Sequence, residues 1–267
     1  MVKIIDSVNY AKRIQQSILP PLDEMKEGLR DHFIVYKPKD IVSGDFYWMV
    51  RTRISPAGGG VAGAGTGAVT VVAAVDCTGH GVPGALMSII SNTLLNQTIK
   101  NPTINSPAEA LDFVNAELPK NLKAQQKGEI IRDGMDITMC AIDFTNCKIQ
   151  FAGANNSIYV FTNNELKEIK ADKQSISGST DDVKKPFTNH NIQLQKGDML
   201  YLLTDGYADQ FGGPKGKKFK YNQLEQILLE IHALPMAEQK TILDERFEAW
   251  RGSLEQVDDV TFIGVRL

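Results

Sequence analysis

Four aspartates stand where a strand pattern meets a turn, and they are the main functional signal in this chain: Asp45, Asp76, Asp205 and Asp258. Asp76 ends the apolar run 69–75, and Asp205 follows the run 199–204 and precedes Gly206. A carboxylate at such a strand end can turn away from the core. Several of them brought together form an all-oxygen site for a hard cation. Each alone is a weak signal, because a strand-end aspartate is commonly a turn former.

Such a site is suited to phosphate chemistry. Two Mg²⁺ or Mn²⁺ ions about 3.5–4 Å apart can clamp a phosphoryl group and make a bound water nucleophilic near neutral pH. Attack on phosphorus then needs positioning and charge neutralisation more than covalent help. The glycine-rich segment 55–68 could imitate a phosphate-binding loop, but it lacks Gly-Lys-Ser/Thr and lies between two strands. We therefore expect it to be a hairpin connection.

The elements that must position the aspartates are read from periodicity and turn residues. Strands are predicted at 33–36, 46–50, 69–75, 137–144, 148–151, 157–161, 166–169, 191–195, 199–204 and 260–267, and helices at 84–99, 106–122, 221–231 and 235–250. The strands are joined mostly by short turns, which favours antiparallel sheets. Two helix pairs need two apolar surfaces to cover. The predicted fold is therefore α+β, a four-layer αββα sandwich of two mostly antiparallel sheets flanked by helices.

The N-terminus carries its own helix pattern over residues 1–19, which Pro20 and Pro21 end. Two interpretations stay open: a helix docked on the domain, or the end of a longer signalling helix. The predicted organisation is an N-terminal linker or switch helix at 1–21 and one domain at 22–267.

The bulk composition excludes several classes of protein. The net charge of -3 comes without a basic block, which disfavours a nucleic-acid partner. No apolar run reaches membrane-spanning length, so we expect no membrane contact by this fragment. The three cysteines show no CxxC spacing and fit buried residues in a reducing compartment. These features predict a cytoplasmic location, and a tether to a membrane sensor in a longer protein stays open.

Four motifs in order make the sequence recognisable: SGDFY at 43–47, DCTGHGVPGA at 76–85, LTDG at 203–206 and DDVT at 258–261. They resemble the motifs of PPM-type (protein phosphatase 2C-like) serine/threonine phosphatases, and the bacterial SpoIIE-like (stage II sporulation protein E-like) branch is the most similar. The resemblance covers residues 8–267. It includes YAKRIQ at 10–15, which is similar to the helix that links such domains to upstream sensors.

The resemblance implies the αββα fold and a set of roles. Asp76 would bridge two Mn²⁺ or Mg²⁺ ions, and a third ion is compatible with the family. The backbone carbonyl of Cys77 would be a further ligand. Asp45 would bind one ion, whereas Asp205 and Asp258 would bind the other. The bridging hydroxide would attack a phosphoserine or phosphothreonine. These residues form the expected catalytic and metal-binding set.

Several assignments stay open in the sequence. Asp258 and Asp259 are adjacent, so only one can easily face the metals, and we favour Asp258. His80 could be a general acid or could make a hydrogen bond that stabilises its turn. Asp136 could have a peripheral metal or substrate role, although a solvated strand cap is the favoured interpretation. Lys39 is a candidate phosphate contact.

The predicted function is a metal-dependent protein serine/threonine phosphatase that is the output domain of a signalling protein. By analogy with the bacterial branch, its substrate would be a phosphorylated STAS-type anti-anti-sigma factor. The helix at the N-terminus would couple an upstream sensor to the metal site and could mediate a homodimer. The alternative is a non-catalytic pseudophosphatase that binds a partner. Another two-metal enzyme, such as a nucleotidyl cyclase, ranks third because no base-recognition signature is present.

Overall fold

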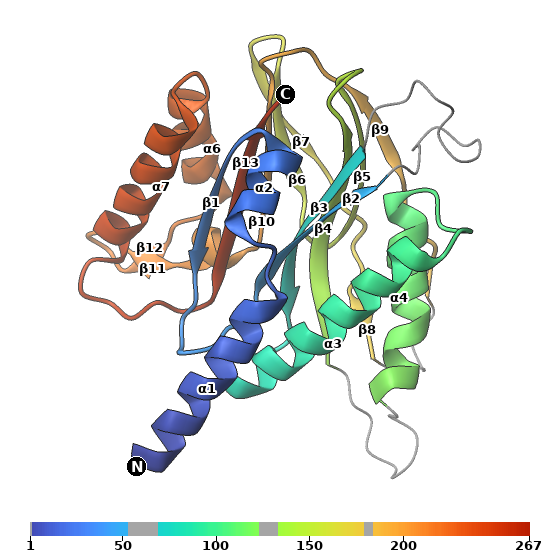
Figure 1. The fold of residues 1–267 in the computed structure, drawn as a ribbon. Helices are drawn as coiled ribbons and strands as arrows, with labels where there is room; N and C mark the ends of the chain where they lie inside the picture. Colours follow the sequence, from blue (N-terminus) through green and yellow to red (C-terminus); the bar gives the residue numbers. More distant parts are fainter. Residues whose placement is uncertain (1, 53–68, 123–132, 179–183) are drawn as a thin grey trace.

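Two antiparallel sheets pack face to face between layers of helices in the computed structural model, which describes residues 2–52, 69–122, 133–178 and 184–267 (Figure 1). The first sheet has the order β1 (Asp31–Lys37), β13 (Val260–Arg266), β10 (Met199–Leu203), β6 (Ile158–Thr162) and β7 (Glu165–Ile169). The second has the order β2 (Phe46–Thr52), β3 (Val69–Cys77), β4 (Gly134–Asp143), β5 (Lys148–Ala154) and β9 (His190–Gln193), and β8 (Ile176–Ser177) pairs with β4.

Helices cover the outer face of each sheet. The helices are α1 (Val2–Ile18), α2 (Leu22–Leu29), α3 (Gly81–Lys100), α4 (Pro107–Leu122), α5 (Gly206–Asp209), α6 (Tyr221–Ile231) and α7 (Met236–Arg251). A small hairpin of β11 (Phe211–Gly212) and β12 (Lys217–Lys218) lies beside α7. In Figure 1, α3 and α4 lie along the sheet that contains β3 and β4, whereas α6 and α7 lie on the opposite side of the molecule. Within the described residues, no helix combines the length and apolarity that a bilayer crossing requires.

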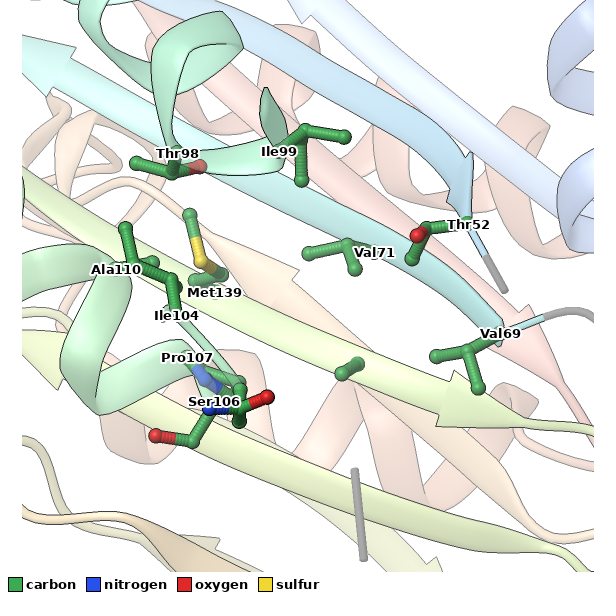
Figure 2. A pocket seen from close by; sticks show the side chains of 12 residues that line it. Thr52, Val69, Val71, Thr98, Ile99, Ile104, Ser106, Pro107, Ala110 and Met139 are labelled. Atoms are coloured by element: carbon green, nitrogen blue, oxygen red, sulfur yellow. The ribbon is translucent and has the colours of Figure 1, made fainter. Parts of the chain in front are cut away.

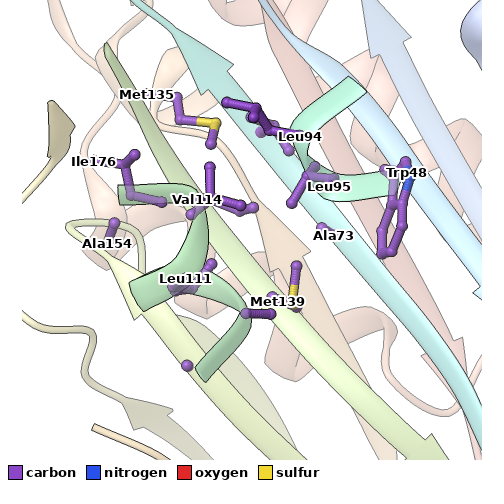
Figure 3. Packing of buried hydrophobic residues seen from close by; sticks show 14 of the residues in the cluster. Trp48, Ala73, Leu94, Leu95, Leu111, Val114, Met135, Met139, Ala154 and Ile176 are labelled. Atoms are coloured by element: carbon purple, nitrogen blue, oxygen red, sulfur yellow. The ribbon is translucent and has the colours of Figure 1, made fainter. Parts of the chain in front are cut away.

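Three apolar clusters hold the four layers together. One fills the space between the sheets and includes Val72, Leu202 and Ile263. A second joins α3 and α4 to the outer face of the second sheet, and its side chains interdigitate between helix and sheet in Figure 3. The third joins α6 and α7 to the first sheet. Inner strands such as β3 and β10 therefore bury both faces, which explains their nearly continuous apolar pattern, whereas the edge strands β7 and β9 are partly exposed.

The predicted four-layer sandwich is confirmed. The helix predicted at 1–19 is α1, and the turn at Asn163 and Asn164 has positive φ at both residues, 52° and 61°, as a tight hairpin requires. The sequence interpretation missed α2. Its signal was short, because only Met25 and Leu29 on this helix are buried apolar side chains. The hairpin connection predicted at 55–68 lies outside the described residues.

Candidate metal centre

Strand register brings the sequence-predicted aspartates to one end of the sandwich. In the second sheet, Asp76 at the end of β3 is paired with Asp136 on β4. Phe46 is paired with Val75, so Asp45 lies beside the same strand end. In the first sheet, β10 runs antiparallel to β13, so the residues that follow β10 and those that precede β13 lie at the same end of the sheet. These residues include Asp205 and Asp258. Each sheet thus contributes carboxylates to a shared site.

A buried hydrogen-bond chain joins the two sheets at this end. The Thr204 hydroxyl donates to Asp45 Oδ2 at 2.6 Å, and the backbone N–H of Thr261 donates to the Thr204 hydroxyl at 2.9 Å. Asp45 itself is only 2% exposed. Sequence reasoning missed Thr204, although its position one residue before Asp205 was a usable signal. The chain fixes the Asp45 carboxylate relative to the strand that carries Asp205.

Close backbone packing brings the two motif turns of the second sheet together. A Cβ on Gly44 would lie 2.3 Å from the carbonyl oxygen of Gly79 and 2.9 Å from that of Cys77. Only glycine fits at that position. Cys77 is an extended strand residue, and the positive φ of this turn is at Gly79, at 83°. The Cys77 side chain is therefore compatible with the turn, and its carbonyl oxygen faces the segment that carries Asp45.

The adjacent residues Asp258 and Asp259 have different surroundings. Asp259 is buried, and its two oxygens accept hydrogen bonds from the backbone N–H groups of Lys39 and Gly44, both at 2.7 Å. Asp258 is partly exposed, and its Oδ1 accepts from the backbone N–H of Asp259 at 2.9 Å. Asp259 therefore holds the loop before Asp45, whereas Asp258 keeps acceptor capacity for a ligand.

The carboxylates repel one another in a poorly solvated setting. Burial first, and then the charges of neighbouring aspartates, raise the pKa values of Asp45 and Asp76 well above the ordinary range. Burial and the charges of Asp209, Asp258 and Asp136 raise the pKa of Asp205 to about 6, and a hydrogen bond with Asp76 opposes that shift. Burial also raises the pKa of Asp258, whereas the charges of Lys39 and His80 oppose the shift. Positive charge at this end of the sandwich would offset the repulsion between the carboxylates.

Asp136 lies closer to this cluster than expected for the solvated strand cap that the sequence analysis favoured. It is a register partner of Asp76, and its charge contributes to the raised pKa values of Asp76 and Asp205. The Asn155 side-chain amide donates to Asp136 Oδ1 at 3.0 Å. Asp136 is therefore a half-buried member of the acidic group rather than a solvated strand cap.

His80 and Lys39 lie at the rim of the cluster. His80 Nδ1 lies 2.6 Å from Asp40 Oδ2, and the imidazole is about half exposed, at 52%. This contact ties the turn that precedes α3 to the loop that precedes Asp45. Lys39 lies near enough to Asp258 for its charge to oppose the rise in the pKa of that carboxyl.

The donor set fits a hard, hydrated cation. As the side chains stand, no three histidine, cysteine, aspartate or glutamate side chains in the described part of the chain are gathered tightly enough to hold one metal ion. Mg²⁺, however, usually keeps several waters and takes only one or two carboxylates directly. The oxygen-only donors and their mutual repulsion match such an ion. The aspartates at this end of the sandwich are therefore compatible with the divalent cations that the sequence motifs imply.

The cavity in Figure 2 is a different feature. It has a volume of about 40 Å³ and is lined mostly by apolar side chains that include Val69, Ile99 and Met139. Its β2 and β3 residues, Thr52 and Val69, are at the opposite ends of those strands from the aspartates. Of these two places, the carboxylate end has charged side chains and the cavity lining has none.

Comparison with known proteins gives the family. The family described as Stage II sporulation protein E (SpoIIE) matches residues 66–267, which is more than half of the chain. The chain belongs to the SpoIIE family. It is accordingly a PPM-type, metal-dependent protein serine/threonine phosphatase, as the motifs predicted. Comparison with curated proteins gave no match.

Solved structures share this fold. The SiaA-PP2C domain of Pseudomonas aeruginosa matches with a TM-score of 0.84 and 29% identity, over 99% of this chain and 97% of that chain. A PP2C phosphatase domain with a fragment of the regulatory domain of SpoIIE from Bacillus subtilis matches with a TM-score of 0.64 and 18% identity, over 89% and 63%. RsbX in complex with magnesium matches with a TM-score of 0.55 and 14% identity, over 88% and 93%.

Proposed function

We propose that this SpoIIE-family domain hydrolyses phosphoserine or phosphothreonine on a partner protein at the carboxylate end of the sandwich. The observation that supports this most directly is the gathering of Asp45, Asp76, Asp205 and Asp258 from two different sheets, with the pKa of each raised. The charges that act most strongly on these carboxyls come mainly from other aspartates. Lys39 and His80 act on Asp258 with the opposite sign. A pair of divalent cations would supply the missing positive charge.

The proposed ligand set divides between the sheets. Asp76 is central, because the charges of Asp45, Asp205 and Asp258 all act on it. Asp45 and the Cys77 carbonyl would hold one Mn²⁺ or Mg²⁺ with Asp76, and Asp205 and Asp258 would hold the other. When bound, such ions lower the pKa of a coordinated water and neutralise phosphoryl oxygens. Asp136, the register partner of Asp76, is the best candidate for holding a third ion.

The protein side chains would position these groups. The Thr204 hydroxyl would orient Asp45 by donating to its Oδ2. Asp259 keeps the Asp45 loop in place through two backbone N–H groups and is not proposed as a ligand. Lys39 would contact the substrate phosphate, since its backbone is fixed by Asp259 and its charge reaches Asp258. His80 would donate a proton to the leaving-group oxygen from Nε2, since its Nδ1 is in contact with Asp40.

The biological substrate and regulation extend this proposal by analogy. A phosphorylated STAS-type protein is the proposed partner, and the domain would be the cytoplasmic output of a longer signalling protein. The regulatory-domain fragment in the Bacillus subtilis SpoIIE structure supports a connection to a regulatory domain. In this proposal α1 transmits the upstream signal, with or without dimerisation. Deletion of residues 1–19 should therefore change the rate or the oligomeric state.

The decisive experiment compares two Asp→Asn variants. In Mn²⁺ the wild type should hydrolyse p-nitrophenyl phosphate and a phosphoserine protein, and chelation should abolish both activities. Asp76→Asn should lower kcat/KM by more than the roughly 10–100-fold typical of substitutions beyond the direct ligands. Asp23→Asn, at an exposed aspartate on α2, is the control and should retain wild-type activity. Full activity of Asp76→Asn, or of the thoroughly chelated wild type, would contradict the proposal.

A further inference from the structure

The side chain of Gln15, on the N-terminal helix α1, reaches the loop that precedes Asp45. Gln15 is 4% exposed, whereas its neighbour Gln16 is exposed. Its Oε1 accepts from the backbone N–H of Ser43 at 3.0 Å, and its Nε2 donates to the carbonyl oxygen of Ser43. The side-chain amide thus pairs with both backbone groups of one residue, which also fixes the orientation of the amide.

The same amide contacts a second segment of the site. Gln15 Nε2 donates to the hydroxyl of Ser88 at 3.0 Å. Ser88 is a buried residue of α3, the helix that begins directly after the turn that follows Asp76. Gln15 is therefore the point at which α1, the loop before Asp45 and the first turns of α3 meet.

Ser43 is directly connected to the proposed ligand Asp45. The Ser43 hydroxyl accepts from the backbone N–H of Asp45 at 3.1 Å. Between them, Gly44 donates its N–H to Asp259 and packs against the carbonyls of Cys77 and Gly79. Gln15 on α1 and Asp259, directly before β13, hold consecutive residues of this loop. Loss of either would free one side of the loop.

We infer that Gln15 is a positioning residue for the metal centre, which fixes the Ser43–Asp45 segment and so makes metal affinity depend on where α1 is docked. The inference rests on the proposed function, in which Asp45 is a ligand. The physical basis is that a buried amide and the buried backbone groups opposite it are costly without partners, so this pairing strongly favours one loop position. Withdrawal of Gln15 would leave the N–H and C=O of Ser43 unpaired.

The test replaces the amide with an apolar side chain of similar length. Gln15→Met should raise the dissociation constant for Mn²⁺ alone, measured by titration calorimetry near neutral pH, by about 10–100-fold. With p-nitrophenyl phosphate, kcat at saturating Mn²⁺ should stay close to wild type, because the ligands themselves are intact. A role only in stability would instead reduce the folded fraction and leave the Mn²⁺ affinity of the folded protein unchanged. Gln16→Met is the matched control and should equal the wild type in every measurement.

A milder variant covers the case in which Gln15→Met does not fold. Ser88→Ala removes one of the three hydrogen bonds of Gln15 and should weaken Mn²⁺ binding by up to about tenfold, the equivalent of one hydrogen bond. Wild-type Mn²⁺ affinity in Gln15→Met, or in Ser88→Ala where Gln15→Met is unfolded, would overturn the inference. A wild-type protein that neither binds Mn²⁺ nor hydrolyses phosphate esters would instead overturn the proposed function.

Discussion

The space between the two sheets and the carboxylate end of the same strands are stabilised in different ways. On β10, Leu202 is fully buried among aliphatic side chains, and only three residues later Asp205 faces other carboxylates. On β3, Val72 is likewise buried between the sheets, whereas Asp76 ends the strand among like charges. The apolar region is complete in the protein alone, while the acidic end would gain from the proposed cations. The proposed function therefore predicts that folding and metal binding are supported by separate sets of residues.

Removal of apolar volume should have the largest effect on stability. Leu202→Ala should lower the free energy of unfolding by roughly 2–5 kcal/mol, because the surrounding side chains collapse only partly into the cavity. Urea denaturation measures this change, and Leu229→Ala, at a 40% exposed leucine of α6, is the control. Mn²⁺ affinity of the folded Leu202→Ala protein should remain that of the wild type. A strong loss of affinity there would show that the two regions are not separable.

The adjacent aspartates provide a sharper comparison within the acidic end. Asp259→Asn should lower the stability of the chelated protein by about 1–3 kcal/mol, since one of two charge-assisted hydrogen bonds to the 39–44 loop is lost. Asp258→Asn should leave stability unchanged or slightly raised, because it removes a repelling charge, yet it should weaken Mn²⁺ binding. Urea denaturation and Mn²⁺ titration of both variants test this contrast. The reverse pattern would assign the ligand role to Asp259.

The pH dependence should show the smallest effect and should differ in sign between metal-free and metal-bound protein. The pKa of Asp205 is about 6 in the folded protein, above its ordinary value, so its stabilising contribution is complete at low pH and is lost as pH rises through about 6. The chelated protein should therefore melt a few degrees higher at pH 5 than at pH 8, for about 1 kcal/mol of stabilisation.

Mn²⁺ should reverse this trend, because the ion binds the deprotonated carboxylates. Its stabilisation of the protein should be larger at pH 8 than at pH 5. Asp205→Asn should lose part of the pH dependence of the chelated protein. Scanning calorimetry at the two pH values, with and without Mn²⁺, tests both statements. A chelated protein that is more stable at pH 8 would contradict the electrostatic description of the acidic end.

Local sequence signals were sufficient to predict elements whose stabilising contacts join neighbouring residues. The helix predicted at 106–122 begins through contacts between neighbouring residues, and the structure contains it: the Ser106 hydroxyl accepts from the backbone N–H of Glu109 at 3.2 Å. The helix α2 was not predicted, because its eight residues are too short for a clear period and its burial depends on the space between the sheets. Asp136 was underrated for a similar reason, since its partner Asp76 is distant in sequence.

Residue patterns along the chain were enough to predict the acidic strand ends, the alternation of apolar runs and turns, the layered fold and the phosphatase motifs. Long-range packing had to be seen in the folded protein to learn that Asp259 holds the 39–44 loop, that Asp136 pairs with Asp76, and that Gln15 reaches the loop before Asp45. The physical reason is that turn formation and periodicity are local properties of the chain. The partners of a buried polar group are chosen by the packing of segments that are remote in sequence.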